Sequence, residues 1–254
     1  MWLEARHQRI QSLLERLNRV TTDQVVVELG VSRETVRRDF LDLEAQGVLR
    51  RVHGGAVRIQ PEPPIGKRIA TRVKYKQSIA HAVAQRLDRA LTLFLDAGST
   101  TTLLARELAR LSDLTIITNS LDAAYKFREE AEESNSRIIV LGGELSPRLP
   151  ATSGSVTVAE ISRYSVDYAL LSPVAIDAAR GATSFEHDEA AIAQAMVRNA
   201  RQTFILADYS KIGQRSRITY CAANKVDMLF TNTRAAEQEG YGELKAKVGE
   251  VVLA

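Results

Sequence analysis

An alternation of apolar, strand-like runs with helical segments between residues 76 and 231 most constrains the fold of this 254-residue chain. The predicted strands cover residues 91–95, 114–118, 137–141, 167–171, 202–207 and 228–231. The predicted helices cover residues 76–87, 101–110, 121–130, 156–164 and 189–199. Uniformly apolar strands separated by helices are typical of a mostly parallel sheet that is covered on both faces. We therefore predict an α/β domain that binds its ligand at the carboxyl ends of the strands.

The first sixty residues have a different pattern, in which short helices precede two short strands. Apolar side chains at helical spacing predict an amphipathic helix over residues 4–17. Residues 21–30 contain three consecutive valines, which favour a strand, but Thr and Asp near the start and Gly30 at the end favour a helix. We predict a short helix there.

A third helix is predicted to start at the N-cap Ser32 and to end at Gly47. Its apolar residues form one buried stripe, so that Glu34 and Arg38 lie opposite that stripe and are flanked by Thr35 and Arg37. A helix with this distribution can enter the major groove of DNA and contact base edges. On this pattern alone, the two arginines also fit a plain solvated pair.

Residues 48–59 predict two strands around a Gly-Gly turn, which together form a basic hairpin, or wing. The first sixty residues contain ten arginines and no lysine, whereas the whole chain has a net charge of only +3. Arginine suits phosphate and guanine recognition because its planar guanidinium donates two parallel hydrogen bonds. Taken alone, this composition is better explained by an arginine-rich solvated surface.

The run VSRETVRRDF at residues 31–40, followed by Leu43-Glu44, Gly47 and RVHGGA at residues 51–56, resembles the DNA-binding domain of the DeoR family of bacterial regulators. The resemblance implies a winged helix-turn-helix. It also implies that the DNA-contacting residues are Ser32, Arg33, Glu34, Thr35, Arg37, Arg38, Arg51 and His53. One position departs from the expected pattern. Val27 stands where an amphipathic helix normally carries a polar residue, so it either packs on another domain or is exposed.

The proline-rich segment at residues 61–66 is the clearest boundary in the chain. Proline-rich segments stay extended and rather stiff, which predicts a spacer. We divide the chain into a DNA-binding domain (residues 1–60), a linker (61–75) and an effector-binding domain (76–254). The basic residues of the linker region either contact DNA phosphates or are solvated.

The first predicted strand of the larger domain ends in Asp-Ala-Gly-Ser-Thr-Thr, residues 96–101, directly before a helix. Glycine allows a tight turn, and the free amides at a helix N-terminus favour an anion. For this loop taken alone, ordinary capping of the helix is the better explanation. However, four further strands also end in small, hydroxyl, amide or charged residues, and five such ends at one edge favour a pocket for a polyol phosphate.

These strand ends, DAGSTT, TNS (118–120), LGG (141–143) and ADYSK (207–211), are similar to those of the DeoR-family sensor domain, which is akin to ribose-5-phosphate isomerase. The resemblance implies that the effector's phosphate is held by Gly98, Ser99, Thr100 and Thr101. It implies that the rest of the effector site is formed by Asp96, Asn119, Gly142, Gly143 and Lys211. The segment Ser172–Ala175 departs from the family pattern, which has a glycine there, and this departure points to a different ligand.

The leading hypothesis is a transcriptional repressor whose affinity for its operator is controlled by a phosphorylated sugar or polyol. Glycerol 3-phosphate, a pentose phosphate and a hexose phosphate all remain candidates. One rival is a sugar-phosphate isomerase, which needs a carboxylate base such as Asp177, Asp96 or Asp208. Another rival is a structural DNA-binding protein with a vestigial sensor. We expect no catalytic activity, because the loop after the fourth strand offers little acidic chemistry.

Other features narrow the class of protein. No apolar stretch is long enough for a membrane helix, no secretory signal is recognisable, and the single cysteine, Cys221, cannot form an internal disulfide. We expect a cytoplasmic protein without a cofactor. His187 has acidic neighbours but no second histidine nearby, so we expect no metal site. Palindromic operators predict a homodimer or a larger oligomer.

Overall fold

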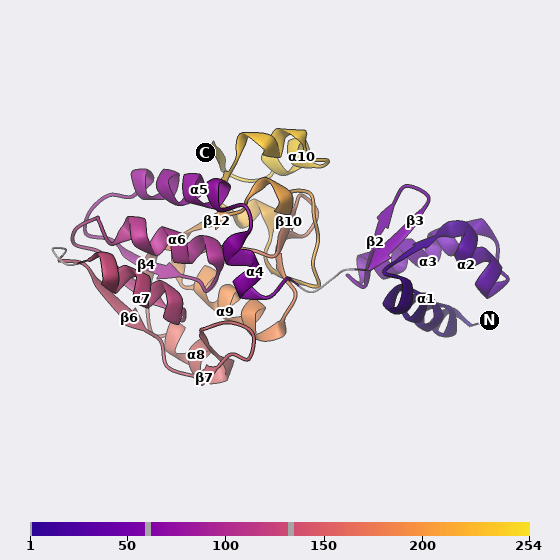
Figure 1. Ribbon diagram of the computed structural model, residues 1–254, viewed down its shortest axis with the longest axis horizontal. Coiled ribbons are helices and arrows are strands. Elements are labelled where there is room, and N and C mark those ends of the chain that lie inside the picture. The colour runs from indigo at the N-terminus through magenta and orange to yellow at the C-terminus, as the bar shows by residue number, and fades with distance from the viewer. Residues whose placement is uncertain (1, 59–61, 132–134) are drawn as a thin grey trace. The chain divides into compact units, whose positions relative to one another are not determined.

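The computed structural model describes residues 2–58, 62–131 and 135–254, which fold into two compact units (Figure 1). One unit contains the N-terminal residues, and the other contains most of the chain from Glu62 onward. Within the described ranges, no helix combines the length and the apolar character that a membrane span requires.

The N-terminal unit is a winged helix-turn-helix. Its elements are α1 (Leu3–Leu17), β1 (Arg19–Thr21), α2 (Thr22–Leu29), α3 (Arg33–Ala45), β2 (Leu49–Val52) and β3 (Gly55–Arg58). The ambiguous valine-rich segment is helical, as predicted. Thr21 and Gln24 form a reciprocal capping box at its start, and Gly30 ends it with a φ of 63°. The predicted end of the wing at Ile59 lies outside the described residues.

The sequence pattern did not predict β1, which completes an antiparallel sheet in the order β1-β3-β2. This strand has only three residues, too few for a visible period. Gly55 lets β3 approach it, because any Cβ at this position would overlap the carbonyl oxygen of Val20. The three helices and the sheet share one apolar core, and Asp39 is buried beside it, where it accepts two hydrogen bonds of 2.8 Å from Arg6.

The second unit has an α/β fold. Its helices are α4 (Ile65–Ala70), α5 (Val73–Arg86), α6 (Ser99–Leu108), α7 (Leu121–Glu130), α8 (Gly154–Ile161), α9 (His187–Arg198) and α10 (Tyr241–Lys245). Its main strands are β4 (Thr92–Leu95), β5 (Thr115–Thr118), β6 (Arg137–Val140), β9 (Val166–Leu171), β12 (Ala200–Leu206), β14 (Met228–Thr231) and β15 (Glu250–Leu253). These seven strands form one sheet in the order β15-β14-β12-β9-β4-β5-β6, and every pairing in it is parallel. The predicted α/β fold is confirmed.

Helices cover both faces of this sheet (Figure 1). Alternate residues of β4 show why: Leu93 and Leu95 pack with α5, α6 and α7, whereas Phe94 packs with α8 and α9 on the opposite face. The strand is apolar throughout because both of its faces are buried. Strand order reverses between β4 and β9, and the carboxyl ends of strands at such a reversal leave a crevice for a ligand.

Two small sheets were not predicted. Strands β10 (Ala175–Asp177), β11 (Gly181–Ser184) and β13 (Ile218–Cys221) form a separate antiparallel sheet. Its first strand, β10, follows β9 in the chain. Strands β7 (Glu144–Leu145) and β8 (Thr152–Ser153) form a short hairpin. All five strands have at most four residues, and their side chains do not alternate between apolar and polar.

The linker region differs from the prediction of an extended spacer. Pro61 lies outside the described residues, and the chain turns helical immediately after Pro64, where α4 begins. A proline before the first helical turn does not disturb the helix, because the amide it lacks would have no intrahelical partner. The proline-rich composition therefore marks the start of a helix as well as a boundary.

Candidate effector site and DNA-reading surface

The start of α3 presents the residues that were predicted to read DNA. The Ser32 hydroxyl accepts a hydrogen bond of 3.1 Å from the Thr35 amide, and the hydroxyl groups of the two residues are 2.9 Å apart. Ser32 thus caps the helix, as predicted. Arg37 and Arg38 are exposed on the solvent side of the helix.

The other charged side chains near this surface form ion pairs that are exposed to solvent. Arg33 lies 2.7 Å from Asp23 of α2, and Arg38 lies 3.5 Å from Glu34 one turn earlier. Exposed pairs of this kind contribute little to stability, so the guanidinium groups can exchange their partners for DNA phosphates.

The wing is attached to α3 by a two-point contact between Arg51 and Glu44. Both the backbone amide and the Nε of Arg51 donate hydrogen bonds of 2.8 Å to the Glu44 carboxylate. Burial raises the pKa of Glu44, but these bonds outweigh it, and the net shift is downward. Arg51 therefore orients the hairpin, while His53 is exposed beside the turn at Gly54, whose φ is 75°.

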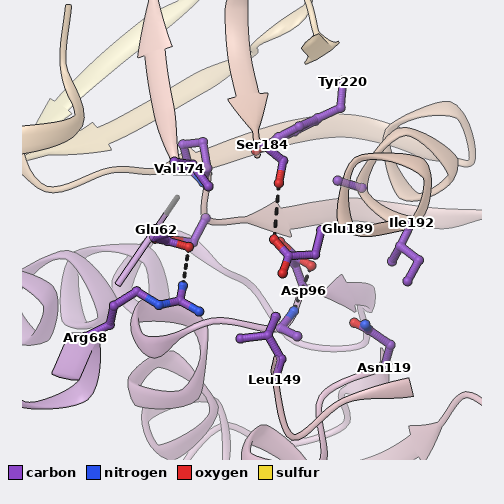
Figure 2. Close-up of a pocket in the computed structure, with 14 residues that line it drawn as sticks. Glu62, Arg68, Asp96, Asn119, Leu149, Val174, Ser184, Glu189, Ile192 and Tyr220 are labelled. Carbon is purple, nitrogen blue, oxygen red and sulfur yellow. Dashed lines mark hydrogen bonds and ion pairs between the residues drawn. The ribbon is translucent and has the colours of Figure 1, made fainter. Parts of the chain in front are cut away.

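In the second unit, a cavity of about 30 Å³ lies at the reversal between β4 and β9. It is lined by the ends of these two strands and by residues from the antiparallel sheet, α9 and the segment before α4 (Figure 2). The lining consists of Glu62, Arg68, Asp96, Ala97, Asn119, Leu149, Ser172, Pro173, Val174, Ser184, Glu189, Ile192, Ala193 and Tyr220. Of the predicted effector residues, Asp96 and Asn119 are in this set.

The predicted phosphate loop lies directly behind the cavity, at the start of α6. Ser99, Thr100 and Thr101 are all buried. Thr101 donates a hydrogen bond of 3.0 Å to the Gly98 carbonyl, which is ordinary local capping. The Thr100 hydroxyl, in contrast, has no hydrogen-bond partner among the described residues. A buried hydroxyl without a partner is unfavourable, so this loop has capacity to bind a further polar group.

Two lysines converge on this region. Lys76 of α5 is buried and donates hydrogen bonds of 2.9 Å to the Ser99 hydroxyl and 2.5 Å to the Arg68 carbonyl. Burial, and then repulsion from Lys211, lowers the pKa of Lys76 to about 8. Lys211 donates to the carbonyl of Pro173 and lies 3.4 Å from the Ser172 hydroxyl.

Sequence reasoning predicted Lys211 but did not select Lys76 or Arg68. Their region was interpreted as either DNA-contacting or solvated, and neither interpretation fits these two residues, because Lys76 is buried and the Arg68 side chain is only 14% exposed. The one available signal was spacing: Lys76 lies three residues before Ile79 and seven before Val83, on the apolar face of α5. A lysine on a buried helix face requires a partner or a function.

The acidic residues of the cavity lining are Glu62, Asp96 and Glu189, of which only Asp96 was predicted. The loop after β9 supplies none of them, whereas Asp96 follows β4 and Glu189 lies in the first turn of α9. Burial raises the pKa of Asp96 to about 7, and the neighbouring Glu189 carboxylate acts in the same direction. Burial also raises the pKa of Glu189, to which the Ser184 hydroxyl donates a hydrogen bond of 3.2 Å (Figure 2).

Asn119 has one free acceptor in the cavity. Its Nδ2 donates a hydrogen bond of 3.0 Å to the Thr152 carbonyl, and its Oδ1 has no partner among the described residues. Gly142 and Gly143 are placed differently from the prediction, because they pack on α8 and are outside the lining set. The Gly142 carbonyl accepts a hydrogen bond from Thr157, and a Cβ at Gly143 would overlap the same hydroxyl. Gly143 therefore allows the close approach of α8, whereas a side chain at Gly142 would meet no atom within 4 Å.

The other candidate carboxylates lie away from this lining set. Asp177 accepts a hydrogen bond of 2.7 Å from the Arg180 amide within the turn between β10 and β11. Asp208 is buried, caps the turn that contains Lys211, and lies 3.7 Å from Arg72. Its role is therefore to orient the Lys211 turn.

Comparison with known proteins gives a consistent picture. A family model described as the DeoR-like helix-turn-helix domain matches residues 6–62, and another described as the DeoR C terminal sensor domain matches residues 71–233. The chain belongs to the DeoR family. It is thus a member of a family of DNA-binding transcriptional regulators, not of a family of enzymes.

Relatives in this family match almost along their whole length. The chain is 31% identical to the glycerol-3-phosphate regulon repressor of Escherichia coli over 229 residues, which are 89% of this chain and 90% of the relative. It is 32% identical to the HTH-type transcriptional repressor GlcR of Bacillus subtilis over 235 residues, with coverage of 91% and 89%. It is 31% identical to the lactose phosphotransferase system repressor of Staphylococcus aureus, with coverage of 87% and 90%.

Solved structures show more distant likeness. Ribose 5-phosphate isomerase A from Methanocaldococcus jannaschii matches at a TM-score of 0.39 and 16% identity, over 56% of this chain and 55% of that one. The full-length sorbitol operon regulator SorC from Klebsiella pneumoniae matches at a TM-score of 0.38 and 14% identity, over 92% of this chain and 98% of that one.

Proposed function

We propose that this DeoR-family regulator is a repressor whose affinity for operator DNA changes when a phosphorylated sugar or polyol binds in the cavity between β4 and β9. The observation that carries the proposal is the division of charge around this cavity. Arg68 of the lining and the nearby Lys76 and Lys211 supply cations at one side, where the Glu62 carboxylate pairs with Arg68 and Lys211. Asp96 and Glu189 supply carboxyl groups at the other side. A phosphate ester with free hydroxyl groups matches this arrangement.

The phosphate is assigned to the cationic side. Lys76 already touches Ser99 at the start of α6, where the free amides and the helix dipole also favour an anion. The unpartnered Thr100 hydroxyl adds one further donor. Charge-assisted hydrogen bonds from two lysines and Arg68 would offset the dehydration of the phosphate.

The hydroxyl groups of the effector are assigned to Asp96, Glu189 and Asn119. Carboxylates and an amide oxygen accept hydrogen bonds, which sugar hydroxyls donate. The names of the relatives support a small phosphate ester, since one is a glycerol-3-phosphate regulon repressor and another is a lactose phosphotransferase system repressor. Ser172 and Pro173, at the departure from the family pattern, line the cavity and would set the identity of the sugar.

The DNA-reading surface is assigned to α3 and the wing. Ser32, Arg33, Glu34, Thr35, Arg37 and Arg38 lie at the start of α3, and Arg51 and His53 lie on the hairpin. We infer a homodimer or larger oligomer, because a palindromic operator requires two such surfaces. We place the protein in the cytoplasm, where its operator is.

The test compares phosphate esters with their parent alcohols. Thermal unfolding is measured with glycerol 3-phosphate, ribose 5-phosphate and glucose 6-phosphate, and with glycerol, ribose and glucose at the same concentrations. We expect one ester to raise the unfolding temperature and to change operator affinity, while its parent sugar or polyol does neither. An equal response to an ester and its parent would contradict the proposed phosphate site.

A further inference from the structure

The cavity is too small for the effector that its chemistry favours. A volume of about 30 Å³ holds one or two waters. Ligand sites of ordinary size are about 300 Å³ or larger. Some lining group must therefore move before a sugar phosphate can enter.

The wall between the cavity and a neighbouring hollow contains one group whose movement would enlarge the cavity. A second hollow of about 240 Å³ lies next to the cavity and is lined partly by Pro63, Pro64 and Ile65 at the start of α4. The two spaces share three lining residues: Glu62, Arg68 and Glu189. Figure 2 shows Glu62 and Arg68 pointing toward each other across this shared wall. If this pair separates, the two spaces of about 30 and 240 Å³ merge and approach the size of an ordinary ligand site.

Glu62 also interacts with the cations that are assigned to the phosphate. Its carboxylate lies 2.5 Å from Arg68 and 3.6 Å from Lys211. All three side chains are at most 16% exposed, so these contacts are protected from solvent. An internal anion therefore already neutralises part of the proposed phosphate site.

We propose that Glu62 is a built-in competitor of the effector, which must displace its carboxylate from Arg68 and Lys211 in order to bind. The proposal rests on the proposed function, because it assumes that the effector is anionic. It adds a regulatory element that links the site to the rest of the chain. Glu62 is the first described residue after the N-terminal unit, so its release changes the anchoring of the segment that joins the DNA-reading unit to the sensor.

Energetic coupling follows from this competition. A ligand shifts an equilibrium only by the difference in its affinity for the two states. Here the effector favours the state in which Glu62 is released, because only in that state are Arg68 and Lys211 free of its carboxylate. Removing the negative charge of Glu62 should therefore mimic part of the effect of the ligand.

The experiment measures binding of inorganic phosphate and of glycerol 3-phosphate by titration calorimetry at constant ionic strength. It compares the full-length protein with Glu62→Gln, which keeps the shape of the side chain, and with Glu62→Asp, which keeps its charge. The matched control is Glu160→Gln, which removes a carboxylate of α8 that pairs with Arg163, and neither residue is in the cavity lining. Circular dichroism verifies that each variant is folded.

We expect Glu62→Gln to bind phosphate at least about fivefold more tightly than the wild type, within the usual range of coupling between sites. Glu62→Asp should stay closer to the wild type, and Glu160→Gln should equal it. Operator affinity of Glu62→Gln without ligand should shift towards the value of the wild type saturated with its effector. Equal phosphate affinity in Glu62→Gln and wild type would overturn the competitor role.

The two proposals can fail separately. If the wild type and Glu62→Gln bind neither phosphate nor any of the esters, the phosphate site itself is wrong, and the competitor falls with it. If the wild type binds an ester and responds to it, but Glu62→Gln behaves identically, only the competitor is wrong. A gain in phosphate affinity that Glu160→Gln shares would indicate a general charge effect and would also overturn the competitor.

Discussion

The DNA-reading surface and the effector cavity hold their charges in opposite environments. The arginines of α3 are exposed, lie within a short run of sequence and form only loose ion pairs. The charges of the cavity are largely shielded from solvent and come from positions as far apart as Glu62 and Lys211. Exposed charges suit a large polyanion, which brings many phosphates and tolerates small displacements. A charge that is shielded from solvent is energetically unfavourable unless it is paired. Such charges can therefore discriminate between small ligands and change their pairing when one binds.

The strongest test of this contrast removes one shielded cation. Lys211→Met should weaken effector binding by about 2–4 kcal/mol, since truncating one partner of a shielded charge pair removes a charge-assisted bond and leaves its partners unpaired. The variant should then repress without responding to the effector. Calorimetry with the effector and a reporter assay with its parent sugar measure the two consequences. A loss smaller than about 0.5 kcal/mol would indicate an exposed ion pair, and the contrast would fail at this residue.

The corresponding test on the exposed surface is Arg38→Ala. We expect a loss of about 1–3 kcal/mol in operator binding if the guanidinium contacts a base edge. Binding to unrelated DNA should then change little. Affinities for operator and for random DNA are measured over a range of salt concentrations. An equal loss on both DNAs, with a smaller salt dependence, would show instead that Arg38 contacts only phosphate.

A third test asks whether the buried charge of Lys76, which is assigned to effector binding, lowers the stability of the folded protein. Burial lowers the pKa of Lys76 to about 8, so the charged form is less favourable in the folded protein than in the unfolded chain. Lys76→Met should raise the free energy of unfolding at pH 7 by about 1–2 kcal/mol, less than the full pKa difference implies, because two hydrogen bonds are also lost.

The pH dependence of the free energy of unfolding shows whether the gain in Lys76→Met comes from removing the charge. Between pH 8 and the ordinary lysine pKa of 10.5, the unfolded chain binds more protons than the folded protein, so wild-type stability should rise with pH. The advantage of Lys76→Met should therefore be complete below pH 8 and shrink as the pH approaches 10. Urea unfolding at pH 7, 8.5 and 9.5 measures it. A constant difference across this range would assign the gain to packing.

The same contrast explains what the sequence could and could not predict. The α3 surface was predictable because a helix brings Glu34 and Arg38 to one face through local spacing alone. The parallel sheet was predictable because strands buried on both faces are apolar throughout, and β14 matches its predicted residue limits for that reason. The loop after β4 was found because its strand, glycine and hydroxyl residues are contiguous.

Local pattern gave little signal for the other residues of the site, apart from the helical spacing of Lys76 with Ile79 and Val83. Arg68 and Lys76 lie in a basic segment whose composition fits a solvated surface, and only the packing of α4 and α5 turns them inward. Glu189 is in the first turn of α9, where an acidic residue is usually a favourable N-terminal charge. Gly143 shows a further ambiguity, because a glycine that packs closely on α8 is indistinguishable in sequence from one that approaches a ligand.

The smallest expected effect concerns Val27, the apolar residue on the otherwise polar side of α2. Its side chain is 83% exposed, so nothing in its own unit compensates for the low helix propensity of valine. Val27→Gln should therefore raise the free energy of unfolding by about 0.3 kcal/mol and leave operator affinity unchanged. Urea unfolding at several protein concentrations measures the first quantity, and operator titration measures the second. If the substitution destabilises the protein in a concentration-dependent manner, Val27 packs against another subunit, and this part of the exposed surface belongs to an interface.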